Sequence, residues 1–119
     1  MGLRDLTLKY IENFNKKNID VIGDMIDDND AYLSDPNTMF IGKKSILNEI
    51  SNLFSFDDLK FYGENVYVLE NSNTSIIEFK IEINGSKLSG VDIIEWKNNK
   101  IAGLRAYVNE DKERNIVNV

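Results

Sequence analysis

The sequence contains no cysteine, no histidine and only one proline, Pro36, in 119 residues. The absence of cysteine excludes disulfides, thiolate catalysis and cysteine-ligated metal sites. The absence of histidine removes the commonest acid-base group near neutral pH, together with every Ser-His or Cys-His nucleophile. Any chemistry performed by this chain must therefore use carboxylates, tyrosine, lysine or arginine.

Positive charge is also scarce, because 20 acidic residues outweigh 14 basic ones and give a formal net charge of -6. This balance repels phosphate backbones, and no cluster of Lys and Arg interleaved with aromatic residues offsets it. We therefore expect no nucleic-acid partner. Long apolar runs are absent from residues 1–10, where Arg4, Asp5 and Lys9 exclude a signal peptide. We expect a cytoplasmic protein that does not associate with membranes.

The chain has enough apolar residues for one core, since 42% of its side chains are hydrophobic. At this length, a single domain over residues 1–119 is expected, because two cores would be too small to be stable. Residues 110–119 read as a charged C-terminal tail of that domain. One functional site is the most that such a domain is expected to hold.

Three helices are predicted in the first half of the chain, where apolar residues recur at steps of three and four. Asn18 is a favourable N-cap for the second helix, and Gly42 with Ser45 begins the third. Tyr10 lies on the buried stripe of the first helix. That stripe consists of Leu3, Leu6, Tyr10 and Phe14.

After residue 59 the apolar period changes to two, which predicts strands over 59–69, 77–83, 87–96 and 101–108. In the second of these, Glu78, Lys80 and Glu82 form a solvent-facing side. The pair Asn84-Gly85 that follows is a strong hairpin signal. Helices followed by a meander of strands indicate an α+β fold, with the helices packed on one face of a curved antiparallel sheet.

Two aspartates stand in apolar surroundings. Asp35 precedes Pro36 in "YLSDPNTMFI", where it either faces an apolar pocket as a base or bonds nearby backbone donors in a turn. Asp92 shares one side of its strand with Ile94 and Trp96. A buried aspartate must be paired, hydrogen-bonded or protonated. Burial raises a carboxyl pKa, and a neutral carboxylic acid can donate a hydrogen bond.

The segments "YIENFNKKNIDVIGDMIDDNDAYLSDP", "IGKKSI", "NGSKLSGVDIIEW" and "KIAGLRAYV" together resemble the nuclear transport factor 2-like superfamily. The likeness runs from about Leu6 to Tyr107 and is to the SnoaL-like and ketosteroid isomerase branch. It implies a cystatin-like cone, in which three N-terminal helices and a strongly curved antiparallel sheet enclose an apolar pocket. It also implies that no cofactor and no metal is needed.

The resemblance implies a role for three residues. Tyr10 falls on the oxyanion tyrosine of the isomerase, Asp35 on its proton-transfer base and Asp92 on its protonated oxyanion aspartate. The implied reaction is a cofactor-free proton transfer within a small apolar ketone, through a dienolate. Strand alternation and the resemblance together predict that the pocket wall contains Leu33, Phe54, Phe79, Ile94, Trp96, Leu104, Ala106 and Val108.

Other functions remain open at this point. Tyr10 can equally be a core tyrosine, and the positions that align with the supporting tyrosines of the isomerase are Ile26 and Ile50. A non-catalytic module for small-ligand binding or dimerisation is the main alternative, because a fold does not fix a function. An epoxide-hydrolase-like Asp-Arg-Asp set would have to use Arg105.

Two further expectations concern metals and partners. The acidic run over 24–30 does not fit a calcium loop, because Leu33 and Met39 stand where glycine and the bidentate glutamate are needed. Apolar residues on the outer sheet face predict a homodimer. We assign Val66, Val68 and Ile76 to that face.

Overall fold

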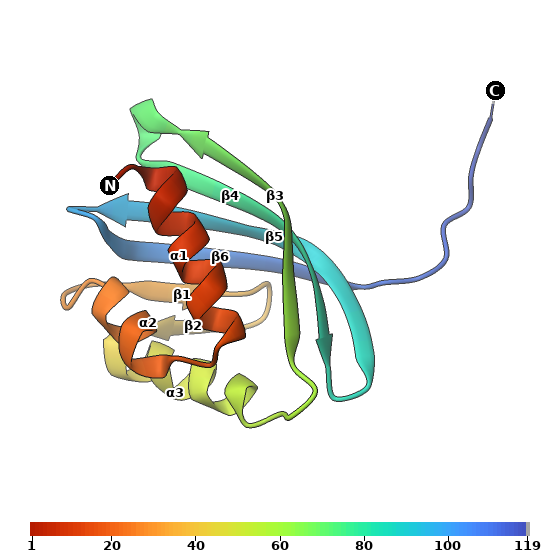
Figure 1. Ribbon diagram of the computed structural model, residues 1–119, viewed down its shortest axis with the longest axis horizontal. Coiled ribbons are helices and arrows are strands. Elements are labelled where there is room, and N and C mark those ends of the chain that lie inside the picture. The colour runs from red at the N-terminus through yellow and green to blue at the C-terminus, as the bar shows by residue number, and fades with distance from the viewer. Residues whose placement is uncertain (119) are drawn as a thin grey trace.

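The computed structural model describes residues 1–118 and contains three helices and six strands. All three helices lie on the same face of one curved sheet (Figure 1). The predicted α+β architecture is therefore confirmed. The helices are α1 (Leu3–Asn15), α2 (Ile19–Met25) and α3 (Lys43–Phe54), and the strands are β1 (Tyr32–Ser34), β2 (Met39–Ile41), β3 (Lys60–Leu69), β4 (Thr74–Ile83), β5 (Ser86–Lys97) and β6 (Lys100–Glu110).

The helices begin where the sequence predicts them. The Asn18 side chain accepts a hydrogen bond from the backbone N–H of Val21 at 3.4 Å, which caps α2. Gly42 precedes α3 with φ +91°, a conformation that residues with a Cβ rarely adopt. The predicted stripe of α1 is at most 8% exposed and packs mainly against β3. Burial of this stripe fixes the helix across the sheet.

The strand order in the sheet is β2-β1-β6-β5-β4-β3. Four of the neighbouring pairs are antiparallel, and the pair β1–β6 is parallel, with Tyr32 beside Gly103 and Ser34 beside Arg105. The sheet is therefore mixed, and the expectation of a purely antiparallel sheet is wrong at this one pair. The reason is that β1 and β2 form a short hairpin around Pro36, and β1 adds to the free edge of β6.

Tight turns connect the long strands as predicted. Asn84 and Gly85 have φ +50° and +76° between β4 and β5, which is the geometry of a two-residue hairpin turn. Both of their backbone N–H groups donate to the carboxylate of Asp58, each at 2.8 Å. Asn98 and Asn99 have positive φ in the turn between β5 and β6. These turns set the register in which β5 carries its buried side chains.

The prediction for the outer face of the sheet is partly wrong because β3 contains a bulge. The pairing with β4 shifts between Gly63 and Asn65, so the alternation of sides reverses there. Val66 and Val68 consequently lie opposite Ile77 and Ser75, which are fully buried on the helix-covered face. Only Ile76 of the three assigned residues faces outward, and it does so opposite Tyr67.

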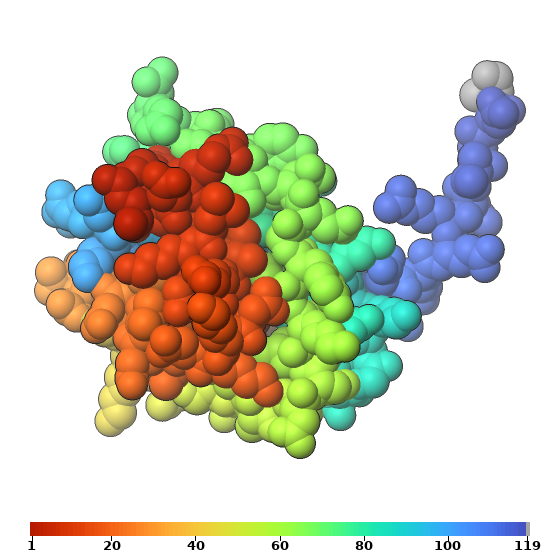
Figure 2. All heavy atoms as spheres, in the orientation of Figure 1, coloured from red at the N-terminus to blue at the C-terminus, as the bar shows by residue number. Residues whose placement is uncertain are grey.

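The sheet ends at Glu110, and residues 111–118 form no helix or strand. Asp111 donates from its backbone N–H to the Lys87 carbonyl at 2.9 Å, and residues 112–118 lead away from the body of the molecule (Figure 2). Glu110 is thus part of β6 rather than of the expected tail over 110–119, and residue 119 lies outside the described residues. Within residues 1–118, no helix has the length and apolar character needed to cross a membrane.

Candidate functional site

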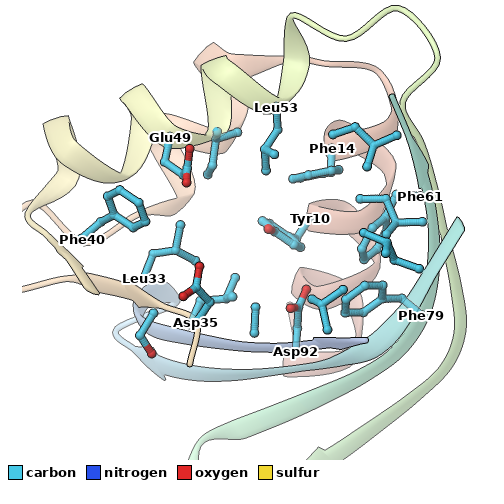
Figure 3. Close-up of a pocket in the computed structure, with 18 residues that line it drawn as sticks. Tyr10, Phe14, Leu33, Asp35, Phe40, Glu49, Leu53, Phe61, Phe79 and Asp92 are labelled. Atoms are coloured by element: carbon cyan, nitrogen blue, oxygen red, sulfur yellow. The ribbon is translucent and has the colours of Figure 1, made fainter. Parts of the chain in front are cut away.

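A cavity of about 280 Å³ lies between the helices and the curved face of the sheet. Helices α1 and α3 and all six strands contribute residues to its wall (Figure 3). Most of these residues are apolar. Within the described chain, no lysine or arginine lines the cavity, and its polar residues are Tyr10, Ser34, Asp35, Glu49 and Asp92.

Five of the eight predicted wall residues line this cavity: Leu33, Phe79, Leu104, Ala106 and Val108. The other three lie elsewhere in the core. Phe54 packs its ring edge against Phe14, with centroids 5.0 Å apart. Ile94 is fully buried, and Trp96 donates from Nε1 to the Ser75 hydroxyl at 2.9 Å. The side of β5 was predicted correctly, but the cavity reaches only as far along this strand as Asp92.

Tyr10 and Asp92 lie deep in the cavity, and they are 4% and 5% exposed. Figure 3 shows the Tyr10 hydroxyl, from α1, and the Asp92 carboxyl, from β5, directed into the interior. Within residues 1–118, neither group forms a hydrogen bond or an ion pair with protein, and neither is sealed away from the cavity. Both groups are therefore available to a molecule in the cavity.

Burial determines the protonation of this pair. Desolvation raises the pKa of Asp92 to about 7, because no cation or donor compensates its charge. Desolvation, followed by repulsion from Asp92, raises the pKa of Tyr10 well above its ordinary value. The phenol stays protonated, and the neutral acid form of Asp92 is well populated near pH 7. Each can donate one hydrogen bond to the same region of the cavity.

Asp35 lies at the mouth of the cavity, on the wall that faces Tyr10 and Asp92 (Figure 3). Its side chain is exposed, and Oδ1 accepts hydrogen bonds from the backbone N–H groups of Asn37 at 2.8 Å and Thr38 at 2.7 Å. This arrangement is an Asx turn. The turn thus holds one carboxylate oxygen, and no group within residues 1–118 forms a hydrogen bond with the second oxygen, Oδ2.

Arg105 lies outside the cavity. It pairs with Ile93 across the outer face of the sheet, and its Nη1 donates to Glu95 and to the Tyr32 hydroxyl, both at 2.7 Å. These contacts raise the pKa of Arg105. An Asp-Arg-Asp set within the cavity is therefore excluded, and the epoxide-hydrolase-like alternative is wrong for this chain.

Sequence reasoning missed Glu49, which lines the cavity from α3. A signal was present, because Glu49 lies three residues after Ile46 and four before Leu53, on the apolar face of the helix. It also missed Phe40 of β2, whose strand is too short to show a periodic pattern.

No protein-family model matches the sequence, and no curated protein matches it. Similar solved structures do exist. One is a protein from Cytophaga hutchinsonii described as NTF2-like and of unknown function, with a TM-score of 0.80 and 17% identity, covering 92% of this chain and 91% of that one.

Two other structures carry names that suggest an activity. A proposed ketosteroid isomerase from Kribbella flavida has a TM-score of 0.83 and 14% identity, covering 97% of this chain and 83% of that one. A proposed SnoaL-like polyketide cyclase from Shewanella putrefaciens has a TM-score of 0.76 and 12% identity, covering 91% and 90%.

At such low identity, these structures share a fold with this chain and nothing narrower. Nearly the full length of each protein takes part in the match, so the whole chain has the shared fold. The resemblance seen in the sequence is confirmed at this level. The chain therefore has the fold of the nuclear transport factor 2-like proteins, a fold also seen in the proposed SnoaL-like and ketosteroid isomerase structures.

Proposed function

We propose that the protein is a cofactor-free isomerase that transfers a proton within a small apolar ketone, in the manner of ketosteroid isomerase. The observation that carries the proposal is a pair of buried groups, Tyr10 and Asp92, that have no partner among residues 1–118 and lie in a cavity lined mostly by apolar side chains. Two donors aimed into a dry site stabilise an oxygen that becomes negative during a reaction. A ketone is the simplest ligand whose oxygen does so.

In the proposed mechanism, the substrate is a β,γ-unsaturated ketone, and Oδ2 of Asp35 removes a proton from the carbon between its carbonyl and its double bond. The electrons of that C–H bond form a carbon-carbon double bond, and the carbonyl oxygen of the resulting dienolate takes the charge. Tyr10 and protonated Asp92 donate hydrogen bonds to this oxygen, each contributing on the order of 3 kcal/mol. Asp35 then returns the proton further along the carbon chain, which yields the conjugated ketone and restores the carboxylate.

The size of the cavity bears on the substrate. A cavity of about 280 Å³ lies at the small end of the range of about 300–1,000 Å³ typical of small-molecule sites. A ketone with one or two rings fills such a volume. We therefore propose a substrate of that size rather than one with four fused rings.

A second candidate function is a binding module that holds such a ketone without converting it. The state of Asp35 favours this alternative, because the side chain is exposed and two backbone donors hold one of its carboxylate oxygens. Contacts of this kind are typical of an aspartate whose role is to hold a turn. Both candidates use Tyr10 and Asp92 in the same way and differ in whether Asp35 acts.

The test is incubation with a β,γ-unsaturated octalone, a two-ring ketone whose isomerisation gives the ultraviolet absorbance of a conjugated enone. We expect Asp35→Asn to lower kcat about 10²- to 10⁴-fold. Asparagine keeps the oxygen that accepts the two backbone N–H bonds, so the turn is retained. Asp57→Asn, an exposed aspartate outside the cavity, is the matched control and should leave kcat unchanged.

The outcomes separate the two candidates. If the octalone is bound and never converted, the binding module replaces the isomerase. If Asp35→Asn isomerises the octalone as fast as the unchanged protein, the assigned base is wrong. If the octalone is neither bound nor converted, both candidate functions fail for two-ring ketones.

We also propose that the protein is a homodimer. Its outer sheet face carries an apolar set, which we call the outer apolar face, and a second copy of the chain would cover it. The set consists of Tyr67, Leu69, Ile76, Val91, Ile93 and Tyr107.

A further inference from the structure

Glu49 is a carboxylate within the cavity that the proposed mechanism does not use. It lies on α3 among Ile46, Ile50 and Leu53, on the side of the helix that faces the sheet. Its side chain is half-buried, and Figure 3 shows its carboxylate directed into the interior, across the cavity from Asp92. The cavity therefore has an acid at each of two separated ends.

The protein supplies no partner for this carboxylate. Among residues 1–118, no side chain or backbone group forms a hydrogen bond or an ion pair with Glu49, and no lysine or arginine lines the cavity. Water at the open mouth solvates the group when the cavity is empty. A ligand that fills the cavity displaces this water, and a polar group that loses its hydrogen bonds on burial opposes binding.

A carboxylate can only accept hydrogen bonds. A fully apolar ligand thus leaves the Glu49 carboxylate without a hydrogen-bond donor. An anionic ligand adds electrostatic repulsion from Glu49 and Asp35. A ligand that carries a donor at the right position replaces the lost water.

We infer that the natural ligand of the cavity has two polar ends, a carbonyl oxygen held by Tyr10 and Asp92 and a hydroxyl or amine that donates to Glu49. Glu49 is then the residue that determines specificity at the second end. The inference rests on the proposed function, because it assumes that a ketone occupies this cavity. It narrows the ligand class to hydroxyketones and aminoketones, and it excludes carboxylated and phosphorylated ketones.

The test measures the binding of a matched set of two-ring ketones by calorimetry. The set consists of decalone, decalones with a hydroxyl at different carbons of the ring that lacks the ketone, the corresponding amines, and the corresponding carboxylates. In the unchanged protein, we expect at least one hydroxyl or amino compound to bind about tenfold more tightly than decalone, as for one hydrogen bond to a charged group. The carboxylates should bind most weakly.

Two variants assign the preference to Glu49. Glu49→Leu removes the acceptor and suits the apolar face of α3, so the hydroxyl derivatives should then bind no more tightly than decalone. Glu49→Gln keeps an acceptor and removes one charge, so the preference for the hydroxyl should persist. The preference for the amine over the carboxylate should weaken, because Asp35 still repels an anion. Glu12→Leu, on the exposed side of α1, is the control and should change none of these ratios.

The inference is overturned if no hydroxyl or amino compound binds more tightly than decalone, or if the preference survives in Glu49→Leu. Its failure differs from failure of the proposed function. Tight binding of the hydroxyl compound without isomerisation of the octalone removes the isomerase and leaves the role of Glu49 intact. Equal binding of all the ketones, together with isomerisation, removes the role of Glu49 and leaves the isomerase.

Discussion

Among single residues, Asp92 is the side chain on which the proposed function depends most. Its cross-strand neighbours are Ile77 on β4 and Ala106 on β6, so the carboxyl is surrounded by apolar groups within the sheet. In the part of the chain that the structure describes, no donor or cation lowers its pKa, and burial raises it to about 7. A buried carboxyl without a partner destabilises the folded state when it is charged. When it is neutral, it can donate a hydrogen bond into the cavity.

The raised pKa of Asp92 predicts how stability depends on pH. Between its unfolded value of 3.8 and about 7, the folded state holds a proton that the unfolded state releases, so the free energy of unfolding falls as pH rises through this range. The difference corresponds to at most about 4 kcal/mol, at about 1.4 kcal/mol per pKa unit. Above pH 7 this contribution should level off.

The measurement is urea denaturation at a series of pH values for the unchanged protein and for Asp92→Asn. The asparagine variant cannot ionise, so the difference in stability between the two proteins should change in favour of the variant from pH 4 to pH 7. Comparing the two proteins removes the effects of other carboxylates, such as Asp58, whose pKa is lowered. Parallel pH profiles would show that Asp92 does not titrate as described.

Some of the site residues could be predicted from the sequence, and others could not. Tyr10, Asp35 and Asp92 were identified from sequence and resemblance, and all three line the cavity. The Asx turn of Asp35 was foreseen only as a rival role, because its two backbone bonds depend on the local path of the chain. Glu49 was missed because the apolar stripe of its helix was assigned from apolar residues alone.

At the scale of elements, long periodic segments were predictable and short or irregular ones were not. The three helices and β3 to β6 repeat one period over many residues, and their turns carry Asn and Gly at positive φ. Strands β1 and β2 have three residues each, too few to show alternation. The bulge in β3 reverses the alternation of sides. The prediction therefore placed Val66 and Val68 on the wrong face, since sequence spacing alone does not reveal an inserted residue.

Substitution by alanine is expected to have opposite effects on stability at two glycines. In β5, a Cβ at Gly90 would collide with the backbone carbonyl of Tyr107 and lie 3.1 Å from Cζ of Phe79, so Gly90→Ala should cost about 1–3 kcal/mol. In α2, a Cβ at Gly23 would meet Leu47 Cδ1 at 3.4 Å, an ordinary contact. Gly23→Ala should therefore stabilise the protein by about 0.5–1 kcal/mol, because alanine favours the helix.

Thermal or urea denaturation of both variants measures this contrast. The two substitutions add the same methyl group, so each serves as the control for the other. A Gly90→Ala protein as stable as Gly23→Ala would mean that β5 and β6 are less closely apposed at the bend of the sheet.

At the scale of the whole molecule, the two faces of the sheet have different roles. The helices cover one face (Figure 1), which also contributes to the cavity, whereas the other face carries the outer apolar face. On that face Tyr67, Leu69 and Tyr107 are 50%, 44% and 47% exposed. A contiguous set of this kind on a sheet is typical of a surface that binds another protein.

We predict that the protein sediments at micromolar concentration with twice its chain mass of 13.7 kDa. The double variant Leu69→Glu and Tyr107→Glu should sediment as a monomer, because buried charges at the contact of two copies oppose association. Leu8→Glu alters an equally exposed apolar residue on α1 and should remain dimeric. A monomer mass for the unchanged protein would remove the dimer and leave the cavity argument unaffected.

Tyr10 and protonated Asp92 are proposed to donate hydrogen bonds to the oxygen of a ketone that fills the cavity. The most direct measurement is the infrared carbonyl stretch of isotopically labelled decalone bound to the protein at pH 5, where Asp92 is neutral. We predict a band at lower frequency than in water, which moves up in Tyr10→Phe and again when Asp92→Leu is added. A bound carbonyl that absorbs at the frequency of an apolar solvent, and is unchanged in both variants, would contradict the account.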